Sequence, residues 1–248
     1  MDNKKTGSIA VISTTIISIL IVLLLDPIKQ NIEYHNFTDQ RTYFGIQNFW
    51  NVISNIPFLL VGVIGLYNII YSTKIKIITS LKIVYILFFL AVSIVAIGSS
   101  YYHIRPDNAS LVWDRLPMSI AFMSLLTIVI SEFISPKIGK TLLWPLISTG
   151  ILSVFYWHSV DDLRLYMLVQ FLPVLVIPLI LLFFKSTFTN TYAYWFLLLI
   201  YVIAKLVEHF DTETYNVLFF ISGHSIKHVI VAFGVYLLLT SYNNRERT

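Results

Sequence analysis

Three histidines with helical spacing could bind one metal ion in this sequence. His224 and His228 are four residues apart, so both imidazoles can project from one face of a helix. His103 lies four residues after Ser99 in a separate apolar stretch, and Asp114 follows after a short polar segment. Three neutral imidazoles leave one tetrahedral position of a zinc ion open, as in catalytic zinc sites. The pattern therefore predicts that His103, His224 and His228 are zinc ligands.

The two other polar residues of this pattern suit a hydrolytic reaction. A catalytic zinc ion lowers the pKa of a bound water to about 7 and polarises a carbonyl group. Asp114 could accept the proton of that water or orient it, and Ser99 could donate a hydrogen bond to the developing oxyanion or to the water. Lys205 and Glu208 are interpreted as an i,i+3 ion pair facing the helix bundle, with a supporting role behind the ligands as the alternative.

The composition is that of a membrane protein. Apolar residues make up 57% of the 248 residues and charged residues 12%, whereas a soluble domain carries about 25% charged residues. No cysteine is present, so a transition metal would need His, Asp or Glu ligands. The net charge of +4 comes from short connections between apolar runs and does not indicate a nucleic-acid partner.

Eight apolar runs are long enough to cross a bilayer as helices. Backbone polar groups must be satisfied within lipid, which favours helices over isolated strands. We expect an all-α, polytopic membrane helix bundle with a seven-helix core and one extra N-terminal transmembrane helix. The expected runs are about 9–25, 49–71, 82–103, 111–134, 141–158, 166–184, 191–209 and 217–241.

The chain divides into three predicted parts. Residues 1–48 hold the N-terminal transmembrane helix and a polar interfacial connection, residues 49–241 form the seven-helix domain, and residues 242–248 form a cytoplasmic tail. The first run has the basic start and apolar core of a signal peptide. It lacks an Ala-x-Ala cleavage pattern near residue 25, so we expect a retained helix.

The charges of the connections predict an orientation. Lys and Arg gather at the N-terminus, at 74–82, at 137–140, at 185 and at 245–247, and these segments alternate with acidic or mixed ones. By the positive-inside rule, both termini are cytoplasmic and all six histidines lie towards the other face. A chain rich in Ile, Asn and Lys suggests a bacterial source. We therefore expect an inner-membrane protein whose metal site lies near the periplasmic face.

These motifs resemble those of the alkaline ceramidase family, part of a superfamily of seven-helix membrane hydrolases that includes the progestin and adiponectin receptors. The resembling residues are Ser99-x-x-x-His103, Asp114 and His224-x-x-x-His228. The segment 48–55, Asn-Phe-Trp-Asn-Val-Ile-Ser-Asn, also resembles the start of the first core helix. The likeness covers about residues 39–241. It implies a zinc-dependent amidase that cleaves ceramide or a related N-acyl lipid into a fatty acid and a sphingoid-type amine.

The chain departs from the family near the start of the core. Eukaryotic members resemble one another in an acidic calcium site before the first core helix. The corresponding stretch offers Asp39 and Asn48 at most and lacks the Asp-Trp-x-Glu cluster. Calcium binding is therefore doubtful for this chain.

Two other functions stay open on the sequence alone. A seven-helix receptor or regulator could use the same histidines as a structural zinc site. A proton-coupled transporter could use Lys205, Glu208 and Asp161, although nearly all charges lie at the ends of the runs. The expected partner is a membrane lipid substrate. The oligomeric state, the lipid head group and the chain length are not predicted by the sequence.

Overall fold

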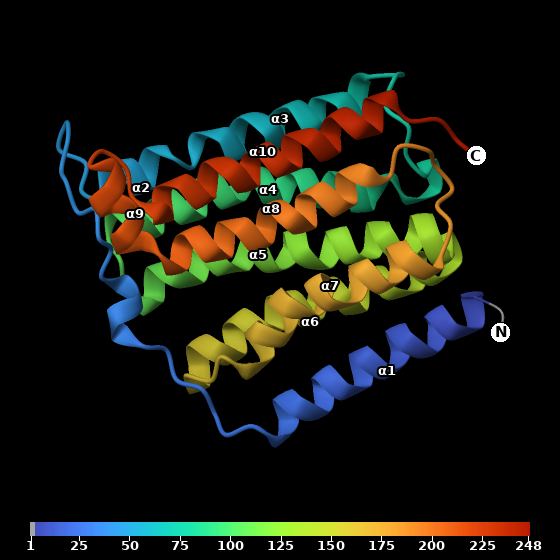
Figure 1. The fold of residues 1–248 in the computed structure, drawn as a ribbon, viewed down its shortest axis with the longest axis horizontal. Coiled ribbons are helices and arrows are strands. Elements are labelled where there is room, and N and C mark those ends of the chain that lie inside the picture. Colours follow the sequence, from blue (N-terminus) through green and yellow to red (C-terminus); the bar gives the residue numbers. More distant parts are fainter. Residues whose placement is uncertain (1–2) are drawn as a thin grey trace.

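The computed structural model describes residues 3–248, and these residues are helical with no β-strand (Figure 1). Three short segments complete the helices: the 3₁₀ turns η1 (Ile32–His35) and η2 (Thr79–Leu81), and the π-helical turn η3 (Ile130–Ile134). The helices are α1 (Asn3–Leu24), α2 (Phe49–Ile53), α3 (Ile56–Tyr71), α4 (Lys82–Ile104), α5 (Asn108–Val129), α6 (Pro136–Val160), α7 (Arg164–Phe183), α8 (Tyr192–His209), α9 (Asp211–Leu218) and α10 (Gly223–Asn244).

Eight of the described segments are long and apolar enough to cross a membrane. The expected all-α bundle is confirmed, and the protein is a multi-pass integral membrane protein. The first core span is interrupted between α2 and α3. There, the side chains of Ser54 and Asn55 both donate hydrogen bonds to the Asn51 carbonyl oxygen and compete with the helical backbone.

The predicted start of the last span at residue 217 is wrong. Residues 210–216 were expected to be a loop, but α9 occupies most of them and α10 begins only at Gly223. Phe219 ends α9 in a left-handed conformation with φ of 61°, and the Ser222 side chain accepts a hydrogen bond from the Ser225 backbone at the start of α10. His224 and His228 therefore occupy the first two turns of the last helix.

The packing places α4 and α5 in the centre of the bundle. Helix α4 also packs on α3, and α5 on α6 and α7, while α8 packs mainly on α10 and α1 on α7 (Figure 1). A Cβ at Gly98 would lie 2.0 Å from the Trp113 carbonyl oxygen, so a larger residue would separate α4 from α5. This close approach brings the last turns of α4 next to the first turns of α5.

Helix α5 begins with a capping box. The Asp107 carboxylate accepts a hydrogen bond from the Ser110 backbone N–H at 2.6 Å, which lowers the pKa of Asp107. The Ser110 hydroxyl in turn accepts from the Asp107 backbone N–H at 3.1 Å. The cap fixes the start of the helix that carries Asp114.

The connection 25–48 is tied to the end of the bundle where the histidines lie. The Leu163 backbone N–H donates to the Ile28 carbonyl at 2.8 Å, and the Gln30 backbone N–H donates to Asp161 at 3.1 Å. Hydrogen bonds from the Arg164 side chain lower the pKa of Asp162 to about 2, which keeps this neighbouring carboxylate charged. The connection and α9 together cover this end of the bundle, which we call the histidine end (Figure 1).

Candidate functional site

The structure brings His103, His224 and His228 together. Each offers a ring nitrogen, and these three atoms lie within 4.8 Å of one another. The Nε2 atoms of His103 and His224 are 3.3 Å apart. The three side chains are buried, coming from the last turn of α4 and the first two turns of α10. Three converging imidazoles in this arrangement could hold a metal ion.

Each of the three histidines is also held by a different polar residue. The Ser54 hydroxyl bonds with Nδ1 of His228 at 2.8 Å. The Asn48 side chain donates to the His103 carbonyl oxygen at 2.8 Å, and Asp211 accepts from the His224 backbone N–H at 2.6 Å.

No sequence pattern revealed the contacts that Ser54 and Asp211 make with the histidines. Ser54 belongs to the segment 48–55, which was singled out for its resemblance but not for a contact with a histidine. Asp211 lies in the stretch that was expected to be a loop.

Asp114 and Ser99 lie beside the histidines. Both line the same cavity as the three imidazoles. Both side chains are buried. A carboxylate and a hydroxyl therefore face a cavity next to a potential metal position, which is an arrangement able to move a proton.

Phe37 covers the cluster on the side of the 25–48 connection. Its ring centroid is 4.7 Å from those of both His103 and His224, and the residue is 5% exposed. The next residue anchors this segment to α9, because the Thr38 backbone N–H donates to Asp211 at 3.3 Å. A second anchor is Arg41, which donates to the Phe220 carbonyl oxygen at 2.7 Å. Phe37 thus acts as a cover over two of the imidazoles.

Asp39 and Asn48, the residues that the sequence suggested at most for calcium, do not fit a calcium site. Both carboxylate oxygens of Asp39 accept hydrogen bonds from the Arg41 side chain, at 2.8 and 2.7 Å. Asn48 uses its side-chain amide to bond with His103. The Arg41 guanidinium thus provides the positive charge next to Asp39, and the hydrogen bonds to the Asp39 carboxylate raise the pKa of Arg41.

Glu208 links two lysines beside the cluster. The expected pair with Lys205 is confirmed at 2.7 Å, and Lys227 of α10 contacts the other carboxylate oxygen. Glu208 Oε1 is also 4.0 Å from Nδ1 of His224. Lys227 was not recognised in the sequence, although its place three residues after His224 puts it on a neighbouring part of the same helix face.

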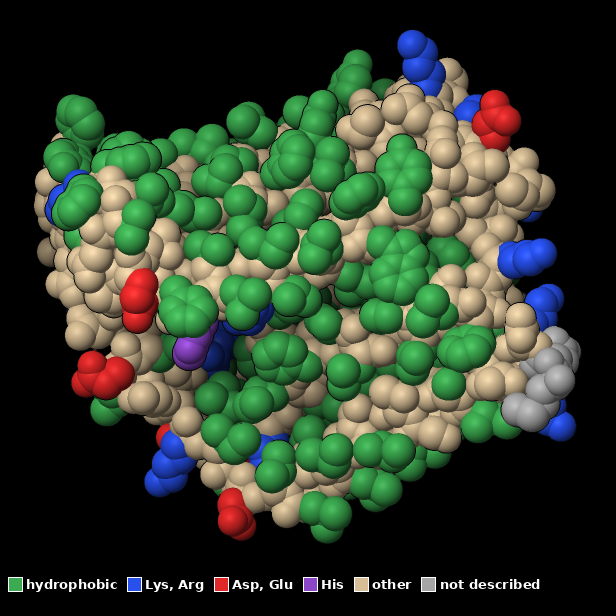
Figure 2. Space-filling model, viewed as in Figure 1, with side chains coloured by type: hydrophobic (Ala, Val, Ile, Leu, Met, Phe, Trp, Pro, Cys, Tyr) green, Lys and Arg blue, Asp and Glu red, His purple; other side chains and the backbone are tan. Residues whose placement is uncertain are grey.

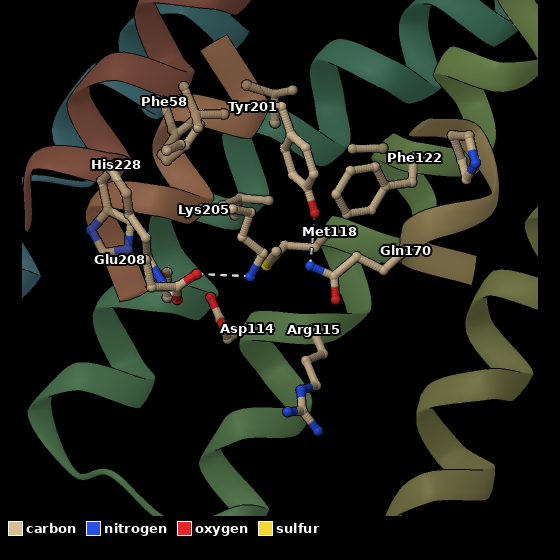
Figure 3. A pocket seen from close by; sticks show the side chains of 18 of the residues that line it. Phe58, Asp114, Arg115, Met118, Phe122, Gln170, Tyr201, Lys205, Glu208 and His228 are labelled. Carbon is tan, nitrogen blue, oxygen red and sulfur yellow. Dashed lines mark hydrogen bonds and ion pairs between the residues drawn. The ribbon is translucent and has the colours of Figure 1, made fainter. Parts of the chain in front are cut away.

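A cavity of about 270 Å³ extends from the histidines into the bundle. Figure 3 shows Asp114, Glu208 and Lys205 approaching one another, with Gln170 and Tyr201 further along. Gln170 of α7 donates to the Tyr201 hydroxyl of α8 at 2.9 Å and bridges the two helices. Beyond this bridge the walls are apolar and include Phe88, Val92, Leu125, Ile177 and Val235.

The cavity reaches the lipid-facing surface between α7 and α8. These two consecutive helices do not form a closely packed pair, although both contribute to the cavity wall. Figure 2 shows a hollow in this face, with blue Lys or Arg side chains inside it. A molecule within the bilayer could therefore reach the histidine cluster laterally.

The fold and site define a multi-pass helical membrane protein with three buried histidines able to hold a metal ion. The Ceramidase family model matches residues 40–218. The chain therefore belongs to the ceramidase family and is a ceramidase-type hydrolase, which implies a lipid substrate and an amide bond as its target. A comparison with curated proteins found no match. The matched range contains Ser99, His103 and Asp114 and ends before α10, whose two histidines the fold brings to the same place.

Proposed function

We propose that this protein is a zinc-dependent membrane amidase that hydrolyses the N-acyl bond of ceramide or a related N-acyl lipid. The products are a free fatty acid and a sphingoid-type amine. The observation that carries the proposal is the buried convergence of His103, His224 and His228 beside Asp114, on a cavity that opens to the lipid-facing surface. Membership of the ceramidase family supports the same reaction class.

The donor set fits zinc. A tetrahedral zinc site with Zn–N bonds of about 2.0–2.1 Å has ligand atoms about 3.3–3.4 Å apart. The separation of the His103 and His224 Nε2 atoms is 3.3 Å. Ser54 engages Nδ1 of His228, which leaves Nε2 of that ring as the ligand atom. Ser54 also donates to the Asn51 carbonyl at 3.1 Å, so its oxygen is free to accept the Nδ1 proton.

The protein side chains would handle the proton and the developing charge. A bound zinc ion would supply a Lewis acid for the amide carbonyl and a lowered pKa for the attacking water. Asp114 takes one proton from the attacking water while the water oxygen forms its bond to the acyl carbon. Asp114 then returns the proton to the amide nitrogen as the C–N bond breaks. Ser99 lines the cavity beside Asp114, where its single hydroxyl proton would either orient that carboxylate or stabilise the oxyanion.

The surrounding helices would bind the lipid. The apolar far part of the cavity suits an acyl chain, while the polar part near Glu208 suits the groups around the amide. We also propose that the histidine end faces the extracytoplasmic side, with both termini cytoplasmic, in a bacterial inner membrane. The distribution of Lys and Arg in the connections supports this orientation.

Hydrolysis by the purified protein tests the proposal. Zinc-loaded protein in detergent micelles is given ceramide, and released fatty acid is measured by mass spectrometry. His224→Ala should lose both bound zinc and turnover, because two imidazoles with no third partner bind zinc weakly. His209→Ala is the matched control, since His209 is exposed at the same end of the bundle.

Two results would contradict the proposal. Full activity in His224→Ala would remove the histidines from the mechanism. Stoichiometric zinc without turnover of ceramide or any other N-acyl lipid would favour a receptor with a structural zinc site.

A further inference from the structure

Two lysines line the cavity next to the proposed catalytic centre, and neither is required by the reaction described above. Lys205 projects from α8 and Lys227 from α10, and both contact the carboxylate of Glu208. Figure 3 shows Lys205 reaching across the cavity towards Glu208 and Asp114. Glu208 Oε1 is 4.0 Å from Nδ1 of His224, so the two lysines that contact this carboxylate lie beside the histidine cluster.

The ammonium groups have unused hydrogen-bonding capacity. A lysine has three N–H donors. Within residues 3–248, Lys205 and Lys227 each make one hydrogen bond, and the two share the carboxylate of Glu208. The Lys205 side chain is 39% exposed and that of Lys227 17%. Both lysines can therefore donate further hydrogen bonds to a molecule in the cavity.

The charges around the cavity favour an anionic ligand. Among the described residues that line it, Lys205, Lys227 and Arg115 are cationic, while Glu208 and Asp114 are anionic. The lining is thus positive by one charge before any metal ion binds to the neutral imidazoles. A charge that is not balanced is costly at membrane depth, where little water is available to solvate it.

Arg115 is already committed to another part of the structure. It bonds to Gln30 at 2.7 Å, and its guanidinium lies 4.1 Å from the Trp157 ring centroid. Figure 3 shows Arg115 pointing away from Glu208 and Lys205. The two lysines are therefore the lining cations that lie with Glu208 beside the histidines.

We propose that Lys205 and Lys227 form a binding subsite for the carboxylate of a lipid. The hollow between α7 and α8 gives lateral access, and the apolar walls beyond Gln170 and Tyr201 accept the hydrocarbon chain. A carboxylate carries the negative charge that this positive lining favours. This inference rests on the proposed amide hydrolysis, because that reaction offers two sources of a lipid carboxylate. One is the fatty acid product, and the other is an acidic head group on the substrate, as in an N-acyl amino acid.

The test measures binding and does not depend on turnover. Purified full-length protein, zinc-loaded or metal-free, is titrated with palmitic acid and with hexadecanol in competition with a fluorescent fatty acid. We expect palmitic acid to bind about tenfold more tightly than the alcohol, as one charge-assisted hydrogen bond would give. Lys205→Met should bring the ratio towards one, and Lys205→Arg should preserve most of it.

Lys185→Met is the matched control, because Lys185 is exposed and lies in the connection after α7, outside the cavity lining. Equal binding of acid and alcohol by the wild type would overturn the proposal. A preference for the acid that survives in the Lys205→Met, Lys227→Met double variant would also overturn it. A preference that disappears only when the metal is removed would do the same, because the metal would then bind the carboxylate.

A second comparison distinguishes the two sources of the carboxylate. N-palmitoylglycine and N-palmitoylethanolamine share an acyl chain and an amide but differ in the charge of the head group. An acidic head group predicts about tenfold tighter binding of N-palmitoylglycine, removed by Lys205→Met. The product alternative predicts equal binding of these two lipids together with tight binding of palmitic acid. Failure to cleave ceramide as well as these two lipids would contradict the proposed function and leave the binding result intact.

Discussion

Two clusters of buried charge lie at opposite ends of the bundle, and they differ in how fully their polar groups are satisfied. At the end away from the histidines, Glu132 of η3 pairs with Arg245 through two hydrogen bonds of 2.6 and 2.9 Å. The hydroxyls of Tyr85 and Tyr194 donate to the same carboxylate at 2.6 and 2.8 Å. The Arg245 guanidinium also donates to the Lys76 carbonyl at 2.8 Å. This cluster does not line the cavity beside the histidines.

The histidine end is satisfied only in part. Nδ1 of His103 is buried without a hydrogen-bond partner among the described residues, and the Nε2 atoms of His103 and His224 face each other. Lys205 and Lys227 retain spare donors towards the cavity. Buried polar groups are normally paired, so incomplete pairing on a cavity wall indicates a position for a ligand. The closed cluster is therefore suited to stabilising the fold, and the open one to the chemistry that we propose.

The comparison predicts a large loss of rate from a small change at the open cluster. Asp114→Asn keeps the size of the side chain but cannot accept the proton of water, so the rate of fatty acid release should fall about 10²- to 10⁴-fold. Zinc content and thermal stability should stay near those of the wild type. Glu213→Gln, an exposed carboxylate substitution on α9, is the control. Unchanged turnover in Asp114→Asn would contradict the view that the histidine end carries the reaction.

The closed cluster should behave in the opposite way. Arg245→Met leaves the Glu132 carboxylate buried without its charged partner, which should lower the free energy of unfolding by about 3–5 kcal/mol. Chemical denaturation in detergent measures this loss. The surviving folded protein should keep its zinc stoichiometry. Adding Glu132→Gln removes the unpaired charge and should restore part of the stability, and a double variant less stable than Arg245→Met would argue against a structural ion pair.

A finer test concerns the support behind one ligand. Ser54→Ala removes the hydrogen bond that orients the His228 ring, so zinc affinity should fall about 10- to 100-fold. Competition with a zinc-binding dye measures the affinity. Ser93→Ala is the control, because the buried Ser93 hydroxyl bonds only within its own helix, to the Phe89 carbonyl at 3.0 Å. Equal zinc affinities in the two variants would mean that Ser54 does not orient the ligand.

The smallest expected effect concerns the cover over the histidines. Phe37→Ala removes the ring that packs against His103 and His224, so a water-soluble chelator should remove zinc about tenfold faster, as a modest gain in local opening would allow. Phe44→Ala is the control, because Phe44 is 93% exposed. Equal rates of zinc removal from the two variants would show that water already reaches the histidines past Phe37.

Local sequence patterns predicted much of the bundle and of the histidine cluster. The apolar runs marked the spans because a membrane helix must be both long and apolar. The spacing of His224 and His228 marked a shared face because an α-helix repeats every 3.6 residues. Asp114 could be grouped with His103 because a short connection joins their helices. His103 was grouped with the other two histidines by the predicted membrane face and by the family resemblance.

The missed features depend on contacts between distant parts of the chain. Ser54 and His228 are separated by 174 residues, and Glu132 and Arg245 by 113. No local periodicity relates such pairs. The break between α9 and α10 was hidden for a different reason: residues 217–221 are apolar and continue the pattern of the following span, although Phe219 adopts a left-handed conformation.

The uneven support of the two helices beside the lateral opening has a mechanical consequence. Helix α7 is braced by α1, α5 and α6, whereas α8 packs chiefly on α10. A lipid that widened the opening would therefore press on α8, whose main packing partner is the helix that carries His224 and His228.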